Sequence, residues 1–145
     1  MPGSVVMTLD PASAQAKPGE EFIVSVQIQS GSQLVDTAQA SLNFDPAVLS
    51  VVEVQPGPAL PILLQNSSDN QAGTIDFSAG ALPPAQPASG TFVLAQIKFR
   101  ALAPVPSTSL VFQSKMPRQS GAFSEGMPVL ALNGAQNGTI ILTSE

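Results

Sequence analysis

The stretch "FIVSVQIQ", residues 22–29, places an apolar side chain at every second position. These positions are Phe22, Val24, Val26 and Ile28, and from residue 25 onward the positions between them are polar. Successive side chains of a β-strand point to opposite faces, so the pattern predicts a strand with one buried and one solvated face. Turn residues bound the stretch, with Pro18-Gly19 before it and Gly31-Ser32 after it.

Similar runs recur along the chain, separated by segments rich in Pro, Gly and Asn-Gly pairs. The nine strands that we predict cover residues 5–9, 22–29, 35–44, 50–54, 74–80, 91–101, 108–113, 129–132 and 138–143. We find no convincing helical periodicity. Many short strands at this spacing predict an all-β, antiparallel sandwich with a jelly-roll or an immunoglobulin-like topology. The Cys and Trp residues typical of true immunoglobulin domains are absent from the sequence.

The composition is that of one folded domain. A chain of 145 residues can bury most of its apolar surface, and an apolar fraction of 43% argues against disorder. Residues 1–4 resemble an expression start, so we expect a single domain over residues 5–145.

Missing residue types exclude several classes of function. The sequence has no Cys and no His, which removes Cys nucleophiles, imidazole bases and the usual zinc sites. A net charge of −5 makes nucleic acid an unsuitable partner. No apolar run approaches the ~20 residues that span a bilayer, so we expect no membrane insertion. We also expect no metal site, because the acidic residues lack the spacing of a calcium loop.

Asp45-Pro46 interrupts two apolar runs in "SLNFDPAVLSVVEV", residues 41–54. Pro fixes φ, and an Asp side chain can accept a hydrogen bond from a backbone N–H two or three residues later. We therefore interpret Asp45 as the cap of a turn between two strands. A catalytic or metal-binding role is the alternative.

Four sequence elements, taken in order, resemble a cohesin module. They are Pro-Gly-x-x-Phe-x-Val-x-Val at 18–26, "NFDPAVL" at 43–49, "ASGTFVLAQIKFRA" at 88–101 and "NGTIIL" at 137–142. The resemblance covers nearly the whole chain. It implies a nine-stranded antiparallel jelly-roll β-sandwich, in a secreted or cell-surface protein, that binds a dockerin-bearing partner. It also implies that this chain has no cofactor, because calcium would be bound by the dockerin.

In cohesins the dockerin binds one sheet face, which the resemblance places on strands near residues 36–44, 74–80, 91–101 and 128–133. Alternation predicts a polar platform there, with two apolar residues as anchors at one end. These candidate partner-binding residues are Thr37, Gln39, Ser41, Asn43, Thr74, Asp76, Ser78, Phe92, Leu94, Gln96, Lys98 and Arg100. Thr37 and Gln39 lie where the family often has an Asn and an Asp that hydrogen-bond the dockerin.

Other functions remain open at this stage. The polar faces could serve only for solubility, in a structural or adhesive spacer. A carbohydrate-binding module is a further alternative, although sugar platforms generally use exposed Trp or Tyr, and the chain has neither. Phe123 is either a loop residue tucked over the sandwich edge or an exposed contact. A weak homodimer through the exposed sheet is also possible.

Overall fold

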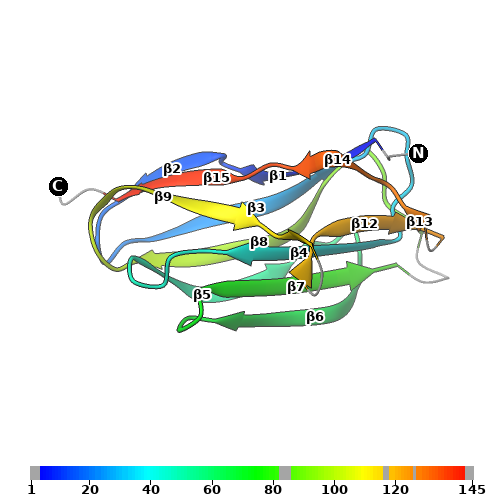
Figure 1. Ribbon diagram of the computed structural model, residues 1–145. Coiled ribbons are helices and arrows are strands. Elements are labelled where there is room, and N and C mark those ends of the chain that lie inside the picture. Colours follow the sequence, from blue (N-terminus) through cyan, green and yellow to red (C-terminus); the bar gives the residue numbers. More distant parts are fainter. Residues whose placement is uncertain (1–3, 82–85, 116–117, 126, 143–145) are drawn as a thin grey trace.

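A computed structural model describes residues 4–81, 86–115, 118–125 and 127–142. Two sheets lie face to face (Figure 1), and the buried apolar side chains of both form one core cluster. All the regular secondary structure in these ranges is strand, and none of it is a helix that could cross a membrane. The all-β sandwich predicted from alternation is therefore confirmed.

The first sheet has five strands. In spatial order they are β14 (Leu130–Ala135), β1 (Val5–Asp10), β3 (Glu21–Gln29), β8 (Thr91–Ala101) and β5 (Leu49–Pro56). The alternating stretch at residues 22–29 forms most of β3, which lies between β1 and β8 and pairs antiparallel with both. Its alternate apolar residues from Val24 to Ile28 are buried, as the pattern predicts.

The second sheet is more irregular. Its main strands are β6 (Ile62–Asp69), β7 (Thr74–Gly80), β4 (Thr37–Asn43), β9 (Val105–Phe112), β15 (Gly138–Leu142) and β2 (Ser13–Ala16). One edge of β4 pairs with β7 over its full length. The other edge pairs with β9 at one end and with β12 (Gly121–Ser124) at the other. Two short pieces extend this region, namely β13 (Met127–Pro128) beside β12 and a hairpin of β10 (Ser114–Lys115) with β11 (Arg118–Gln119).

Three predictions about strands are corrected by the structure. Residues 62–69 form β6, whereas the sequence suggests an irregular apolar stretch and a polar loop there. An edge strand that is exposed along most of its length needs no alternation, which is why the pattern failed. The loop expected at 114–127 contains the short strands β10 to β13. Most pairs are antiparallel, but β1 with β14 and β15 with β2 are parallel.

The core fills the space between the sheets and draws on both. Its largest fully buried side chains include Phe77 from the second sheet and Phe99 from the first. The ring of Phe99 stacks on Phe22 and meets the edge of Phe44, with centroids 5.7 Å away in each case. These contacts join the two layers into one apolar unit.

Asp45 caps a turn, as the sequence predicts. Its Oδ1 accepts a hydrogen bond from the N–H of Ala47 at 2.9 Å, and its carbonyl accepts from Val48 and Leu49. The turn carries the chain from β4 in the second sheet to β5 in the first. The interruption at Asp45-Pro46 is therefore a corner of the scaffold.

Candidate partner-binding face

Seven of the predicted binding residues share one surface, which we call the outer face. It is the solvent side of β12, β4, β7 and β6 in the second sheet. The register sets Thr37, Gln39, Ser41 and Asn43 opposite Gly80, Ser78, Asp76 and Thr74, respectively. The residues between them, such as Ala40 and Phe77, point into the core. Alternation thus assigned the correct side of both strands.

The other five candidates lie elsewhere, which corrects the predicted platform. Phe92, Leu94, Gln96, Lys98 and Arg100 belong to β8, which pairs with β3 and β5 in the first sheet. They therefore cannot share a surface with β4 and β7. Alternation reports which side of a strand is buried but carries no information about the sheet that the strand joins.

Leu94 and Phe92 are also not exposed anchors. Leu94 is 2% exposed and Phe92 is half-buried against the core. The β3–β8 register shifts between Val26 and Gln27, which leaves Leu94 as an extra residue, a β-bulge. One extra residue reverses the alternation, so positions 92 and 94 turn inward while 96, 98 and 100 stay outward.

The outward residues of β8 have partners on their own sheet. Arg100 forms an ion pair with Glu21 of β3. Lys98 and Gln96 line a hollow of about 90 Å³ together with Ile23, Glu53 and Gln55. This surface is opposite the outer face and is of mixed charge.

The centre of the outer face is largely closed by the chain itself. Gln39 Nε2 donates a hydrogen bond of 2.9 Å to the carbonyl oxygen of Gln119, at the end of the β10–β11 hairpin. Ser41 is 1% exposed and Ser78 is 7% exposed, although both point outward. Ser41 Oγ is buried and has no hydrogen-bond partner among the described residues.

Strand β6 extends the outer face, and the sequence analysis missed it. Gln65, Ser67 and Asp69 lie opposite Ser78, Asp76 and Thr74. The turn-forming residues 69–73, next to the clear strand at 74–80, are the one sequence signal that indicates a hairpin here.

Asp69 shapes the turn at the end of β6. Its Oδ1 accepts hydrogen bonds from the N–H groups of Ala72 at 3.0 Å and Gln71 at 2.8 Å. Both bonds favour the ionised carboxylate and hold the pKa of Asp69 below its ordinary value. The charge is fully exposed, so the outer face carries a fixed negative charge at this end.

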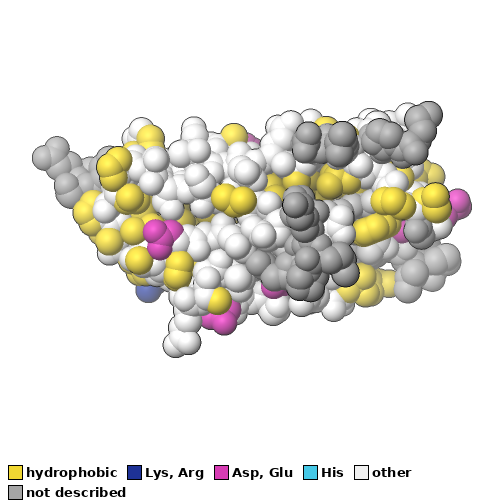
Figure 2. Space-filling model, in the orientation of Figure 1, with side chains coloured by type: hydrophobic (Ala, Val, Ile, Leu, Met, Phe, Trp, Pro, Cys, Tyr) yellow, Lys and Arg dark blue, Asp and Glu magenta, His cyan; other side chains and the backbone are white. Residues whose placement is uncertain are grey.

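The opposite end of the outer face is apolar. Phe123 lies on β12 opposite Thr37 and is half-buried, so it is a strand residue of this face and matches neither the predicted loop residue nor a fully exposed contact. Leu64 at the start of β6 is 57% exposed on this face. Leu63 and Met127 are also exposed, but Leu63 pairs with the inward-pointing Ala79 and Met127 pairs with Ser124, so both lie on the other side of their strands. In Figure 2 hydrophobic side chains gather at the right-hand end of the molecule, where β12, β13 and the start of β6 lie.

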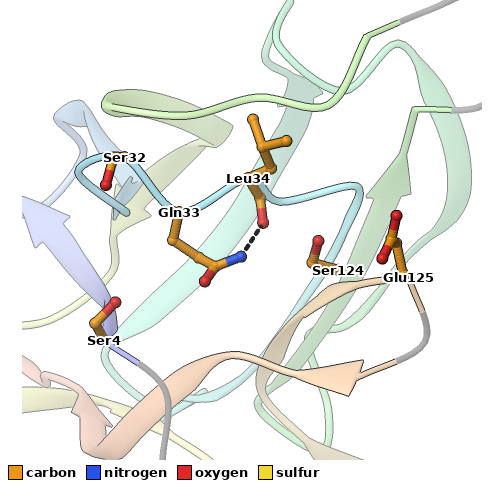
Figure 3. Close-up of a pocket in the computed structure, with 6 residues that line it drawn as sticks. All are labelled: Ser4, Ser32, Gln33, Leu34, Ser124 and Glu125. Atoms are coloured by element: carbon orange, nitrogen blue, oxygen red, sulfur yellow. Dashed lines mark hydrogen bonds between the residues drawn. The ribbon is translucent and has the colours of Figure 1, made fainter.

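A separate hollow of about 380 Å³ lies beside this end (Figure 3). Its lining is Ser4, Ser32, Gln33, Leu34, Ser124 and Glu125. It is shallow and polar, and Gln33 Nε2 donates back to the carbonyl of Leu34. The described residues contain no group of three or more acidic side chains that could hold a metal ion. An extended sheet face is therefore better suited to bind a partner than this hollow.

Comparisons with known proteins agree with the fold. The sequence profile described as Cohesin domain matches residues 7–138. No curated protein sequence matches the chain significantly.

Many solved structures are similar to this chain, and three of them illustrate the likeness over nearly their whole lengths. The third cohesin of ScaC, in complex with the ScaB dockerin from Acetivibrio cellulolyticus, is 15% identical with a TM-score of 0.82, and covers 97% of this chain and 99% of its own. CaCohA2 from Clostridium acetobutylicum is 20% identical with a TM-score of 0.76, covering 99% and 94%. A non-cellulosomal cohesin from the hyperthermophilic archaeon Archaeoglobus fulgidus is 21% identical with a TM-score of 0.75, covering 98% and 93%.

Proposed function

Because this chain belongs to the cohesin domain family, we propose that it is a non-catalytic module that binds a dockerin-bearing protein. The observation that carries this proposal is the family match over residues 7–138. The similar cohesin of ScaC was solved in complex with a dockerin, which supports the same kind of partner here. The composition supports a binding role over catalysis, since the sequence has no Cys or His.

We further propose that the dockerin binds the outer face of β12, β4, β7 and β6. This face combines exposed Leu64 and half-buried Phe123 at one end with hydrogen-bonding groups and the acidic Asp69 at the other. Protein interfaces typically have an apolar core with a polar rim, and the outer face offers both. The face of the first sheet around Lys98 and Glu53 carries charged side chains of both signs beside exposed Ile23.

The calcium in such a complex would be bound by the dockerin, and the parent protein would be secreted or on the cell surface. In that setting the module would hold dockerin-bearing proteins in an extracellular assembly. The dockerin would need calcium to fold, and only the folded dockerin would bind. Calcium would therefore be required for binding but not for the folding of this chain.

Titration calorimetry against the dockerin modules encoded in the same genome tests the proposal. We expect at least one calcium-loaded dockerin to bind with a Kd of about 1 µM or tighter. Failure of the whole panel to bind would overturn the proposal and favour a structural spacer.

Two matched arginine variants test which face is used. Thr37→Arg places a long cation on the outer face, whereas Ser25→Arg places one on the first sheet, where Ser25 pairs with Gln96. Both positions are half-buried strand residues with a hydroxyl group. We expect only Thr37→Arg to weaken binding, with both variants retaining the wild-type circular dichroism spectrum. Weakening by Ser25→Arg alone would move the site to the first sheet.

A further inference from the structure

Strand β6 forms one edge of the second sheet. It pairs with β7, and no other strand of the described residues pairs with it. In Figure 1 it lies at the lower margin of the molecule, with no strand beyond it. An antiparallel strand directs about half of its backbone N–H and C=O groups to each side. The outer edge of β6 therefore presents backbone groups with which another strand could pair.

The corresponding edge of the first sheet is closed by side chains. Within the described residues β5 pairs only with β8, but the side-chain amide of Asn70 bonds both the N–H and the carbonyl of Val51. Asn66 Nδ2 also donates to the carbonyl of Val54, at 3.0 Å. No side chain of the described residues bonds the backbone of residues 63–68 in this way. The chain thus closes the edge of β5 and leaves that of β6 open.

The usual protections of an edge strand are also missing from β6. It is eight residues long, and residues 63–69 are all exposed. Natural edge strands are often guarded by Lys, by Pro or by a short length, whereas residues 62–69 contain neither Lys nor Pro. The bulge at Leu64 breaks the ladder near one end only, so residues 65–69 pair regularly with β7. This regular stretch is suited to pairing with a further strand.

A second copy of β6 is complementary to this stretch. Opposed residues of an antiparallel pair point to the same face, so in a two-fold symmetric pair one residue must face its own copy at the axis. Ser67 is the centre of the regular stretch. An axis there sets Gln65 opposite Asp69 twice and Asn66 opposite Ser68 twice. Each of these pairs brings an amide donor to a carboxylate or hydroxyl acceptor.

The negative charge of the chain does not oppose this pairing. Residues 62–68 are uncharged, although the whole chain carries a net charge of −5. The nearest like charges would be the two Asp69 carboxylates, which lie two residues from the axis on opposite sides of it. At about 3.4 Å per residue they are about 14 Å apart along the pair. This separation exceeds the screening length of about 8 Å at physiological ionic strength.

We propose that two copies of this chain associate edge to edge through β6, antiparallel and about a two-fold axis at Ser67. The pairing continues the second sheet from one copy into the other. It uses the backbone edge of β6 and not a sheet face, so it does not depend on the proposed function. A ladder of five residues is smaller than the interface of about 800 Å² per partner that is typical of stable complexes, so the dimer is weak and reversible.

Disulfide formation tests the position of the axis, because the chain has no Cys of its own. Opposed residues of an antiparallel pair have Cα atoms about 4.5–5.5 Å apart, which a disulfide can span. Under mild oxidation, Ser67→Cys should form a linked dimer at least about tenfold faster than Gln96→Cys. Gln96 is also exposed, but it lies on β8, which has a strand on each side. Equal rates would overturn the proposal.

Rotational correlation times from NMR relaxation test the association of the unmodified chain. At about 1 mM we expect a value above that of the monomer, which falls to the monomer value on dilution to about 10 µM. Ser67→Lys sets two cations face to face at the axis and should stay monomeric at about 1 mM, whereas Ser67→Thr should associate like the wild type. Circular dichroism checks the fold of each variant.

Two results of this experiment would contradict the pairing. A wild type that stays monomeric at about 1 mM would show that the edge of β6 does not associate. A dimer that persists in Ser67→Lys would show that the copies associate through another surface, such as a sheet face. Neither result bears on dockerin binding, which calorimetry measures separately.

Discussion

At the scale of single residues, two polar side chains complete backbone pairing that the strands leave open. Ser120 Oγ accepts from the N–H of Ser41 at 3.0 Å and donates to its carbonyl at 3.1 Å. It does so where β4 passes from pairing with β9 to pairing with β12. Asn70 does the same for Val51 of β5, with bonds of 2.7 and 3.0 Å. Unpaired buried backbone groups are costly, so these side chains stabilise the irregular points of the sandwich.

We expect Ser120→Ala to destabilise the protein by about 1–3 kcal/mol, because it leaves the buried N–H of Ser41 without a partner. It also removes one of the two hydrogen bonds to the Ser41 carbonyl, which still accepts from the N–H of Gln113. Urea unfolding should give a lower midpoint with an unchanged m-value. Ser109→Ala, at an exposed position of β9, serves as the control and should change stability by less than about 0.5 kcal/mol. Equal stability of the two variants would contradict this role for Ser120.

Asp69 makes stability depend on pH in a predictable direction. Its pKa is lowered by hydrogen bonds from the Ala72 and Gln71 N–H groups. A lowered folded-state pKa stabilises the native state above the unfolded value of about 3.9, and this stabilisation is lost as the pH falls through the folded value. Asp69→Ala should therefore melt below the wild type at pH 7, and the difference should shrink as the pH falls below about 4. Melting curves with a constant difference over this range would argue against the assignment.

At the scale of elements, the bulge in β8 decides which of its side chains are buried. Leu94 is the extra residue, and its carbonyl accepts a hydrogen bond from the N–H of Gly57 at 2.9 Å. A Cβ at Gly57 would lie 2.0 Å from the carbonyl oxygen of Val93, so only glycine allows this close approach. One inserted residue thus moves Leu94 from the predicted surface to the core.

We expect Leu94→Ala to destabilise the fold by about 2–5 kcal/mol, which is the usual cost of a cavity in a packed core. Gln96→Ala, two residues later on the exposed side, should cost less than about 0.5 kcal/mol. Chemical denaturation of the two variants measures the difference. If Leu94→Ala instead reduced dockerin binding with no loss of stability, the original view of Leu94 as a surface anchor would be restored.

At the scale of the whole molecule, the chain changes sheets near both ends. It leaves β1 in the first sheet for β2 in the second, and later leaves β14 in the first for β15 in the second. Parallel pairs therefore occur at both places, β1 with β14 and β2 with β15. Because the chain crosses between the two sheets, both sheets contribute side chains to one apolar core. We therefore expect folding to depend on the packing of that core.

We expect EDTA to leave the melting temperature of the isolated chain within about 1 °C of its value in calcium, because the described residues hold no metal-binding group of acidic side chains. The same EDTA should abolish binding to the dockerin, where the proposed calcium sites lie. Thermal melts and calorimetry on the same samples measure both effects. A clear fall in the melting temperature with EDTA would place a calcium site on this chain.

The sequence by itself determined what is local. Alternation predicted the inward and outward sides of β3, β4 and β7, and turn residues predicted the corner at Asp45. The absence of Cys and His excluded several classes of catalytic and metal-binding function. These properties depend on a few neighbouring residues, because side-chain direction follows from the strand geometry itself.

Only the tertiary structure decided which strands share a sheet. Strands pair through backbone groups that every residue except proline has, so the sequence does not say whether β8 joins β4 or β3. The bulge at Leu94, the hairpin bonded to Gln39 and the exposed edge strand β6 also depend on contacts between distant segments. For that reason the binding residues predicted on β4 and β7 share one face, while those predicted on β8 belong to the opposite sheet.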